Sequence, residues 1–178
     1  MHLNFSLRSK SGDHVVISLM ILLNEKKTMR YKHIQANLAE KYQIEGGEVT
    51  SILASAQDTD NRVSIFDSRL PQGNEAPWHY HEIDDEIFYV ISGEIEFGVD
   101  QEQFVAKSGD LVIAGPHVPR RFKAITDSHL LIINSPSGPS EEFIRDIASL
   151  PPGHVPSDED EKRFIEKYKI HIIKKESK

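Results

Sequence analysis

The sequence contains no cysteine. This absence excludes disulfide bonds, zinc sites built from thiolates and catalysis by a cysteine nucleophile. Any metal ion in the protein must therefore be held by imidazole and carboxylate groups. The chain has nine histidines and 28 acidic residues, so the ligands for such a site are present.

The sequence also lacks an excess of positive charge. Its formal net charge is −7, and its 21 lysine and arginine residues form no basic stripe. Because binding to the phosphates of a nucleic acid requires a basic surface, the sequence predicts no nucleic acid partner.

No apolar run is long enough to cross a membrane. The longest spans residues 15–23 and is interrupted by Ser18, whereas a membrane-spanning helix needs about 20 apolar residues. Polar residues 24–27 follow where a signal peptide would have its small-residue cleavage site. We therefore expect a cytoplasmic protein with no membrane partner. Residues 15–23 could form an edge strand or a short helix, or belong to an upstream extension with Met29 as the natural start.

The chain divides by composition into three segments. Residues 1–45 form an N-terminal extension, with a short helix expected at residues 34–42. Residues 46–136 are expected to form a β-barrel, and residues 137–178 a helical tail that packs on the barrel or on a partner chain. A chain of 178 residues fits one domain with additional segments at its ends.

The central segment consists of short β-rich runs bounded by turn residues. Turns recur about every 8–12 residues without a long helix between them, a pattern typical of an all-β sandwich or barrel. Ser92 and Gly93 directly separate two of the runs, which indicates a tight hairpin turn. The expected strands span residues 50–54, 62–70, 86–91, 94–99, 104–105, 111–114, 121–125 and 129–134.

Two amphipathic helices are predicted in the tail. The first begins at Ser140, which is followed by two glutamates, and ends before Pro151. The second begins at Ser157 with an acidic first turn, which suits the positive end of the helix dipole. Their apolar positions are Phe143, Ile144, Ile147 and Leu150, and then Phe164, Ile165 and Tyr168.

His79, His81 and Glu86 are the candidate metal ligands. On a strand, side chains two residues apart point to the same face, so the two histidines would lie together. Glu86 begins the next predicted strand after a short polar turn and can lie beside them. Two imidazoles and one carboxylate suit non-haem Fe(II), and also Mn, Co, Ni or Zn. An isolated pair of histidines two residues apart is common, however, and residues 82–85 could be a plain solvated turn.

The spacing of Gly73, His79, His81, Glu86 and Gly93 resembles the first motif of the cupin superfamily. Residues 109–122 resemble the second cupin motif, and the likeness extends over about residues 47–135. It implies a double-stranded β-helix, the jelly-roll barrel of small single-domain cupins such as those called quercetin-dioxygenase-like. The fold expected from the resemblance is therefore all-β, with an N-terminal extension and C-terminal helices.

The second motif departs from the family pattern at Arg120. Cupins usually have a histidine ligand at this position, and a guanidinium has no lone pair with which to bind a metal. In one interpretation the metal stays on the three remaining ligands, and Arg120 binds an anionic substrate or pairs with Glu86. In the other, Arg120 replaces the metal, and the protein is a metal-free binding module.

The resemblance implies a metal-dependent, dioxygenase-like oxidoreductase that acts on a small organic acid or phenolic compound. Glu86 and Arg120 are the candidate catalytic residues, and the cofactor would be Fe, Mn, Ni, Co or Zn. The alternative is a non-catalytic cupin that binds a small molecule. Because cupins commonly dimerise, a homodimer is expected. The residues expected to line the substrate pocket are Phe88, Val90, His117 and Phe122.

Overall fold

The computed structural model describes residues 31–151 and 153–173. Residues 31–178 group into one compact unit, whose strands form two antiparallel sheets. The prediction for residues 15–23 and the suggested start at Met29 lie outside the described residues.

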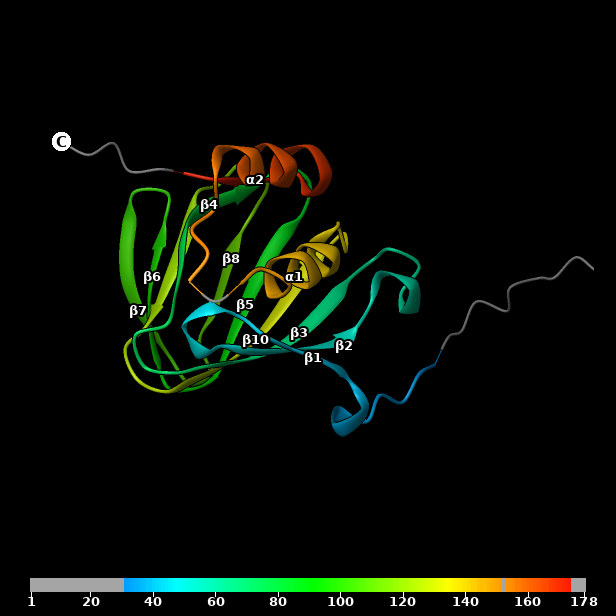
Figure 1. Ribbon diagram of the computed structural model, residues 1–178. Helices are drawn as coiled ribbons and strands as arrows, with labels where there is room; N and C mark the ends of the chain where they lie inside the picture. The colour runs from blue at the N-terminus through cyan, green and yellow to red at the C-terminus, as the bar shows by residue number, and fades with distance from the viewer. Residues whose placement is uncertain (1–30, 152, 174–178) are drawn as a thin grey trace, which may run out of the picture. The chain divides into compact units, whose positions relative to one another are not determined.

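The larger sheet has six strands in the order β1-β2-β3-β10-β5-β8 (Figure 1). Its inner face is apolar in the middle, because Phe88, Ile132 and Phe66 lie side by side across three neighbouring strands. The strands are β1 (Glu40–Gln43), β2 (Val49–Ala54), β3 (Ser64–Leu70), β5 (Asp85–Ser92), β8 (Leu111–Ala114) and β10 (Ser128–Ser135).

The smaller sheet has five strands in the order β11-β4-β9-β6-β7. The chain alternates between the sheets, as a jelly roll requires, so strands that are consecutive in sequence often lie in different sheets. The strands are β4 (Glu75–His81), β6 (Glu94–Val99), β7 (Glu102–Lys107), β9 (Arg120–Ala124) and β11 (Ile170–Ile172).

The main hydrophobic core lies between the two sheets. Phe88 of β5 packs against Phe97 of β6 with ring centroids 5.3 Å apart, and Phe97 packs against Phe122 of β9 at 6.2 Å. Full burial of one such side chain contributes about 1.5–3 kcal/mol to stability. These rings therefore hold the two sheets against each other.

The helices of the tail form a second core. Helix α1 spans Ser140–Ala148 and helix α2 spans Asp158–Arg163. Helix α2 continues directly into a π-helical turn, Phe164–Tyr168. Phe143 contacts Phe164 and Tyr168 at 5.2 Å and 5.6 Å between ring centroids. Figure 1 shows α1 above the strands β1–β3 and α2 beside β4. Both predicted tail helices are confirmed, and Ser157 caps the second of them as expected.

Three short 3-10 turns complete the described structure. They are Ala36–Leu38, Glu45–Gly47 and Ala56–Asp58. The expected helix at residues 34–42 is wrong, because only the first of these turns forms there and β1 follows it. Pairing of β1 with β2 overrides the weak helical pattern.

The sheets extend beyond both expected limits of the barrel. β1 precedes residue 46, and β11 lies in the segment expected to be wholly helical. β11 pairs with β4, where Ile172 lies opposite His79 and Ile170 opposite His81. The tail thus closes the sheet edge beside the candidate ligands, in addition to covering the barrel.

The predicted hairpin at Ser92 and Gly93 is also wrong. β5 and β6 belong to different sheets, so the chain turns a corner here. Gly93 has φ +90°, and a Cβ atom at this position would lie 2.2 Å from the Ser128 hydroxyl oxygen. Glycine is required for both reasons. The tight hairpin of this region joins β6 to β7, where Val99 pairs with Glu102.

Candidate metal centre

His79, His81 and Glu86 converge as the sequence predicts. His79 and His81 lie on β4, and Glu86 lies on β5 of the other sheet. One potential ligand atom from each residue lies within 4.8 Å of the others. The side chains are 12%, 4% and 12% exposed, so the site is largely removed from bulk solvent.

Contacts on the far side of each ring fix the orientation of both histidines. Nδ1 of His79 lies 2.8 Å from the carbonyl oxygen of Pro77, and Nδ1 of His81 lies 2.8 Å from Oδ2 of Asp84. Because a carbonyl and a carboxylate only accept hydrogen bonds, each Nδ1 is the protonated nitrogen. The lone pair of each neutral ring is therefore on Nε2, which faces Glu86.

Asp84 is a functional residue that the sequence analysis missed. It was expected in a solvated turn, but it is 2% exposed and accepts hydrogen bonds from both His81 and the Asn134 amide, the latter at 2.6 Å. A carboxylate behind a ligating histidine fixes its tautomer and ring orientation. The position of Asp84 three residues after His81 was the available signal, and only the fold shows that the Asp84 side chain is buried.

Three hydrogen-bond acceptors meet at the centre of the site. Oε2 of Glu86 lies 3.4 Å from Nε2 of His79 and 3.8 Å from Nε2 of His81. Each Nε2 can give its lone pair to a metal ion or carry a proton, and either state places positive charge beside Glu86. Burial alone would raise the pKa of Glu86, but the charges of His81 and Arg120 and the hydrogen bond with His79 hold it well below its usual value.

Arg120 pairs with Glu86. Its Nε donates to Oε2 of Glu86 at 2.9 Å, and Nη1 donates to the carbonyl oxygens of Val118 and Gly115 at 3.1 Å and 3.4 Å. Its Nη2 has no partner among the described residues. Since Arg120 is 0% exposed and is absent from the described lining of the cavity, its expected contact with a substrate is not supported. The sequence analysis also allowed Arg120 to pair with Glu86, and this ion pair is present.

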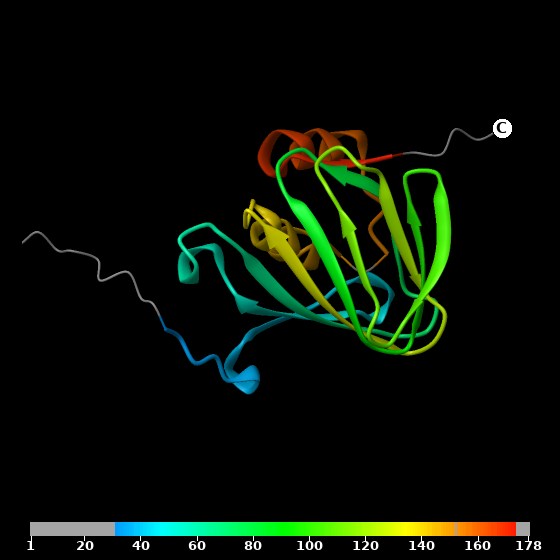
Figure 2. The ribbon, with the colours of Figure 1, turned by 180° about the vertical axis from the view of Figure 1, so that it is seen from behind.

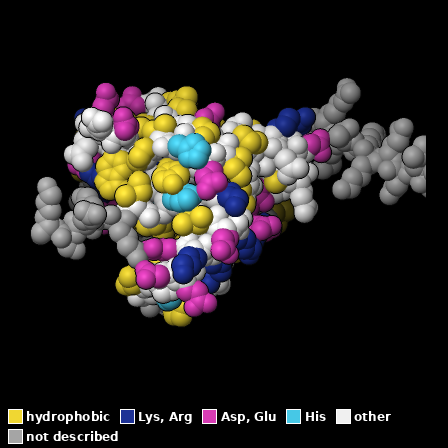
Figure 3. All heavy atoms as spheres, turned by 90° about the horizontal axis from the view of Figure 1, so that it is seen from above, with side chains coloured by type: hydrophobic (Ala, Val, Ile, Leu, Met, Phe, Trp, Pro, Cys, Tyr) yellow, Lys and Arg dark blue, Asp and Glu magenta, His cyan; other side chains and the backbone are white. Residues whose placement is uncertain are grey.

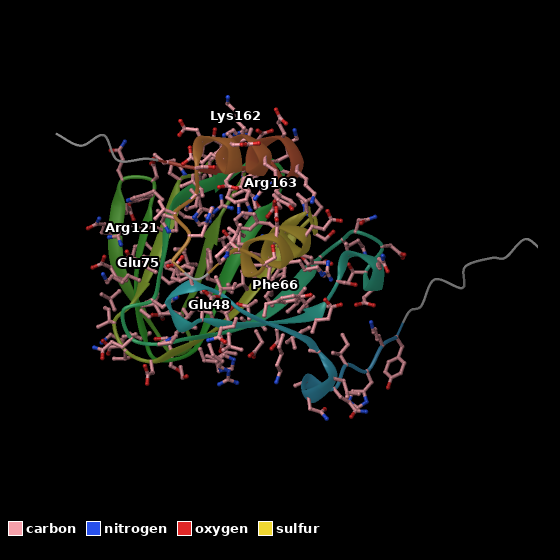
Figure 4. All side chains as sticks on the ribbon, viewed as in Figure 1. Glu48, Phe66, Glu75, Arg121, Lys162 and Arg163 are labelled. Atoms are coloured by element: carbon pink, nitrogen blue, oxygen red, sulfur yellow. The ribbon has the colours of Figure 1, made fainter. Side chains whose placement is uncertain are left out.

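A cavity of about 1060 Å³ adjoins the three candidate ligands. Strands β2, β3 and β10 supply one wall, and α1 supplies another through Phe143, Ile144 and Ile147. Figure 4 shows Glu48 and Phe66 on the side of the larger sheet that α1 faces. Pockets for small molecules typically occupy about 300–1,000 Å³, so this cavity can enclose a ligand of several rings.

The four expected pocket residues have different positions. Phe122 lines the cavity. Phe88 and Val90 are wrong as lining residues, since they are 1% and 0% exposed and pack in the main core between the sheets. His117 is also wrong, because it is exposed in the turn before β9 with φ +62°.

Several other histidines make specific contacts with neighbouring side chains. His129 is 9% exposed, and its Nε2 lies 2.6 Å from Oδ2 of Asp67. His171 of β11 stacks on Tyr80 with ring centroids 4.3 Å apart. Figure 3 shows histidine side chains among hydrophobic ones on the face seen from above. These contacts are structural, and among the described residues only His79, His81 and Glu86 form a group that could hold a metal.

Comparison with known proteins agrees with this fold. Residues 66–135 match the family model of the cupin domain. Quercetin 2,3-dioxygenase of Bacillus subtilis (strain 168) is 29% identical over 76 residues, which are 43% of this chain and 21% of that enzyme. The chain spans 21% and 56% of the lengths of the two curated relatives that it matches.

Solved structures match a larger share of the chain. KdgF from Halomonas sp. has a TM-score of 0.57 and 21% identity over 62% of this chain and 98% of its own. An RmlC-like cupin from Shewanella frigidimarina NCIMB 400 has a TM-score of 0.56 and 24% identity over 64% of this chain and 97% of its own.

The two sheets and the matched domain define the class of the protein, a jelly-roll barrel with a candidate metal site of two histidines and one glutamate. Residues 66–135 match the cupin domain, and the fold is similar to that of solved cupin structures. Within the described residues, no helix has the length and apolar character needed to cross a membrane.

Proposed function

We propose that this protein is a metal-dependent, dioxygenase-like oxidoreductase that acts on a small organic acid or phenolic compound. The observation that carries the proposal is the convergence of potential ligand atoms of His79, His81 and Glu86 within 4.8 Å of one another, with both imidazoles oriented from behind. The name of the Bacillus subtilis relative supports the choice of a phenolic substrate and of dioxygenase chemistry.

The residues present fit a divalent transition metal. His79, His81 and Glu86 would hold it, and the ligand set of two imidazoles and one carboxylate suits Fe, Mn, Co, Ni or Zn. When bound, such a metal activates oxygen or polarises the oxygen atoms of a substrate.

The rest of the site positions these ligands and encloses the substrate. Asp84 and the Pro77 carbonyl hold the imidazoles, and Arg120 holds the Glu86 carboxylate in its ionised form. The apolar wall from α1 excludes water from the substrate.

The second candidate function is that of a metal-free binding protein. It is favoured by the 2.9 Å ion pair between Arg120 and Glu86, which already gives the carboxylate a positive partner. In this case Arg120 alone would balance the charge of Glu86, and the cavity would bind a ligand without chemistry.

Metal analysis of protein purified without a histidine tag distinguishes the two functions. The proposal predicts close to one transition metal ion per chain, or uptake of Fe(II), Mn(II) or Zn(II) to that level. It also predicts oxygen consumption with a flavonol or catechol, which is lost in the Glu86→Ala variant. Failure to take up any of these metals would support the metal-free binding protein.

A further inference from the structure

The cavity has a second polar region, which lies away from the candidate ligands. Thr50 of β2 and Ser68 of β3 lie opposite each other with their hydroxyl oxygens 2.8 Å apart, and they are 1% and 0% exposed. Thr50 also donates to Oε1 of Glu48 at 2.6 Å. All three residues line the cavity. We call Glu48, Thr50 and Ser68 the Glu48 subsite.

An apolar row separates the Glu48 subsite from Glu86. Across the inner face of the larger sheet, Glu86 pairs with Asn134, which pairs in turn with Ser64. Ser68 lies four residues further along β3, beyond Phe66. With about 4.8 Å between strands and 3.3 Å per residue, the two polar ends lie on the order of 15 Å apart.

The Glu48 subsite offers carboxyl and hydroxyl oxygens that can accept a hydrogen bond from a ligand. Burial raises the pKa of Glu48, and the hydrogen bonds from Thr50 and Ser68 offset this only in part. Because burial in this region disfavours negative charge, as the raised pKa of Glu48 indicates, an uncharged partner fits here better than an anion.

Asn74 provides a further acceptor in the same cavity. It is 6% exposed, and its Nδ2 donates to the Glu45 carbonyl oxygen at 3.2 Å. That bond fixes the orientation of the amide, and its Oδ1 has no partner among the described residues. A Cβ atom on Gly46 would lie 2.6 Å from Nδ2, so glycine is needed there for Asn74 to keep this position.

We propose that Glu48, Thr50 and Ser68 bind an uncharged hydroxyl group at the far end of an elongated ligand. The other end of the ligand carries the oxygen atoms that lie at His79, His81 and Glu86, and an apolar middle packs on Phe66 and Ile132. This inference rests on the proposed function, because that function places the reacting end of the ligand at the metal centre. It narrows the substrate class to phenolic compounds with oxygen groups at both ends.

Two stilbene catechols that differ only in a hydroxyl on the distal ring test the Glu48 subsite. Their binding is measured by calorimetry with the full chain, both metal-free and loaded with Co(II). The wild type is expected to bind the hydroxylated probe about tenfold more tightly, as one net hydrogen bond predicts. The Glu48→Ala and Thr50→Val variants should each lose this preference and keep their affinity for the probe without the hydroxyl.

The Glu102→Ala variant is the matched control, since Glu102 is exposed on β7. Thermal unfolding shows which variants are folded, and Thr50→Val, which preserves side-chain shape, remains informative if Glu48→Ala does not fold. Equal affinity of the wild type for both probes would overturn the proposal, as would a preference that persists in both variants. If the preference is present but Co(II) changes neither affinity, the Glu48 subsite stands and the proposed metal function fails.

Discussion

At the scale of single residues, Asp84 determines how His81 can act. Its carboxylate accepts from Nδ1 of His81 and from Asn134, so the Nε2 lone pair is directed at Glu86. A histidine without this partner could rotate or change its tautomer, and both changes would remove the lone pair from the site.

We therefore expect the Asp84→Asn variant to bind Co(II) about 10–100-fold more weakly than the wild type, the usual cost of losing a partner behind a metal-binding histidine. Binding is measured by titration of metal-free protein. Asp85→Asn is the matched control, because Asp85 is adjacent and exposed. Equal losses of Co(II) affinity in the two variants would show that the affinity depends on local charge and not on the orientation of His81.

Glu48 gives a prediction for stability against pH. Its pKa is raised in the folded protein, mainly by burial, above the ordinary value near 4.5. The folded state then binds more protons than the unfolded state, so the contribution of Glu48 is fully present below pH 4.5 and is lost as pH rises through the folded pKa.

Urea unfolding of the wild type and of Glu48→Gln checks this prediction. The wild type should lose free energy of unfolding relative to the variant as pH rises from about 4 to 8, by about 1.4 kcal/mol for each unit by which the pKa is raised. If the difference in free energy of unfolding between the two proteins does not change with pH, the pKa of Glu48 is not raised in the folded state.

At the scale of elements, the corner between β5 and β6 shows what a local pattern can and cannot predict. Ser92 and Gly93 correctly indicate a sharp change of direction. The choice between a hairpin and a corner depends on which sheet receives the next strand, and β6 finds its partners in β9 and β7. The pairing of β6 with β9 joins segments distant in sequence, so no short stretch of sequence contains the information.

The Gly93→Ala variant should be destabilised by about 2 kcal/mol or more, because strain at positive φ is added to the collision with Ser128. Gly109→Ala isolates the first effect, since Gly109 has φ +95° and no atom within 4 Å of its expected Cβ. That variant should lose only about 1 kcal/mol. Chemical denaturation measures both, and equal losses would contradict the collision.

The candidate site was predictable to the extent that it depends on local spacing. His79 and His81 are two residues apart on one strand, and Glu86 follows a short turn, so the three ligands could be named in advance. Two other features could not be predicted in this way. The burial of Asp84 depends on Asn134 of β10, and the cavity wall depends on how helix α1 of the tail packs. Phe88 and Val90 have the right alternation but lie too deep, since burial along β5 depends on the opposite sheet.

At the scale of the whole molecule, the outer face of the larger sheet is apolar over β10, β5 and β8. Ile133, Ile87 and Ile113 pair across β10, β5 and β8, and Leu131, Tyr89 and Leu111 form the next row. Ile113 and Leu111 are 57% and 54% exposed. These strands run side by side in Figure 2. A continuous apolar face of this kind suits a second copy of the chain related by a two-fold axis.

We expect the protein to be a homodimer in solution and the Ile113→Lys variant to be a monomer, since dimerisation would bury an unpaired charge. Light scattering after size exclusion measures both. Lys123→Ala is the control, because Lys123 lies on the smaller sheet and pairs with Glu75 in solvent. A monomeric wild type, or a variant that remains dimeric, would contradict this assignment of the outer face.

The central claim is that His79, His81 and Glu86 bind one divalent metal ion, and it is tested most directly by titrating Co(II) into the metal-free, untagged chain. We predict one bound Co(II) per chain for the wild type and for His33→Ala, whose histidine is exposed and distant in sequence from the site. We predict loss of that binding in His81→Ala. Absence of binding to the wild type, or unchanged stoichiometry and affinity in His81→Ala, would contradict the claim.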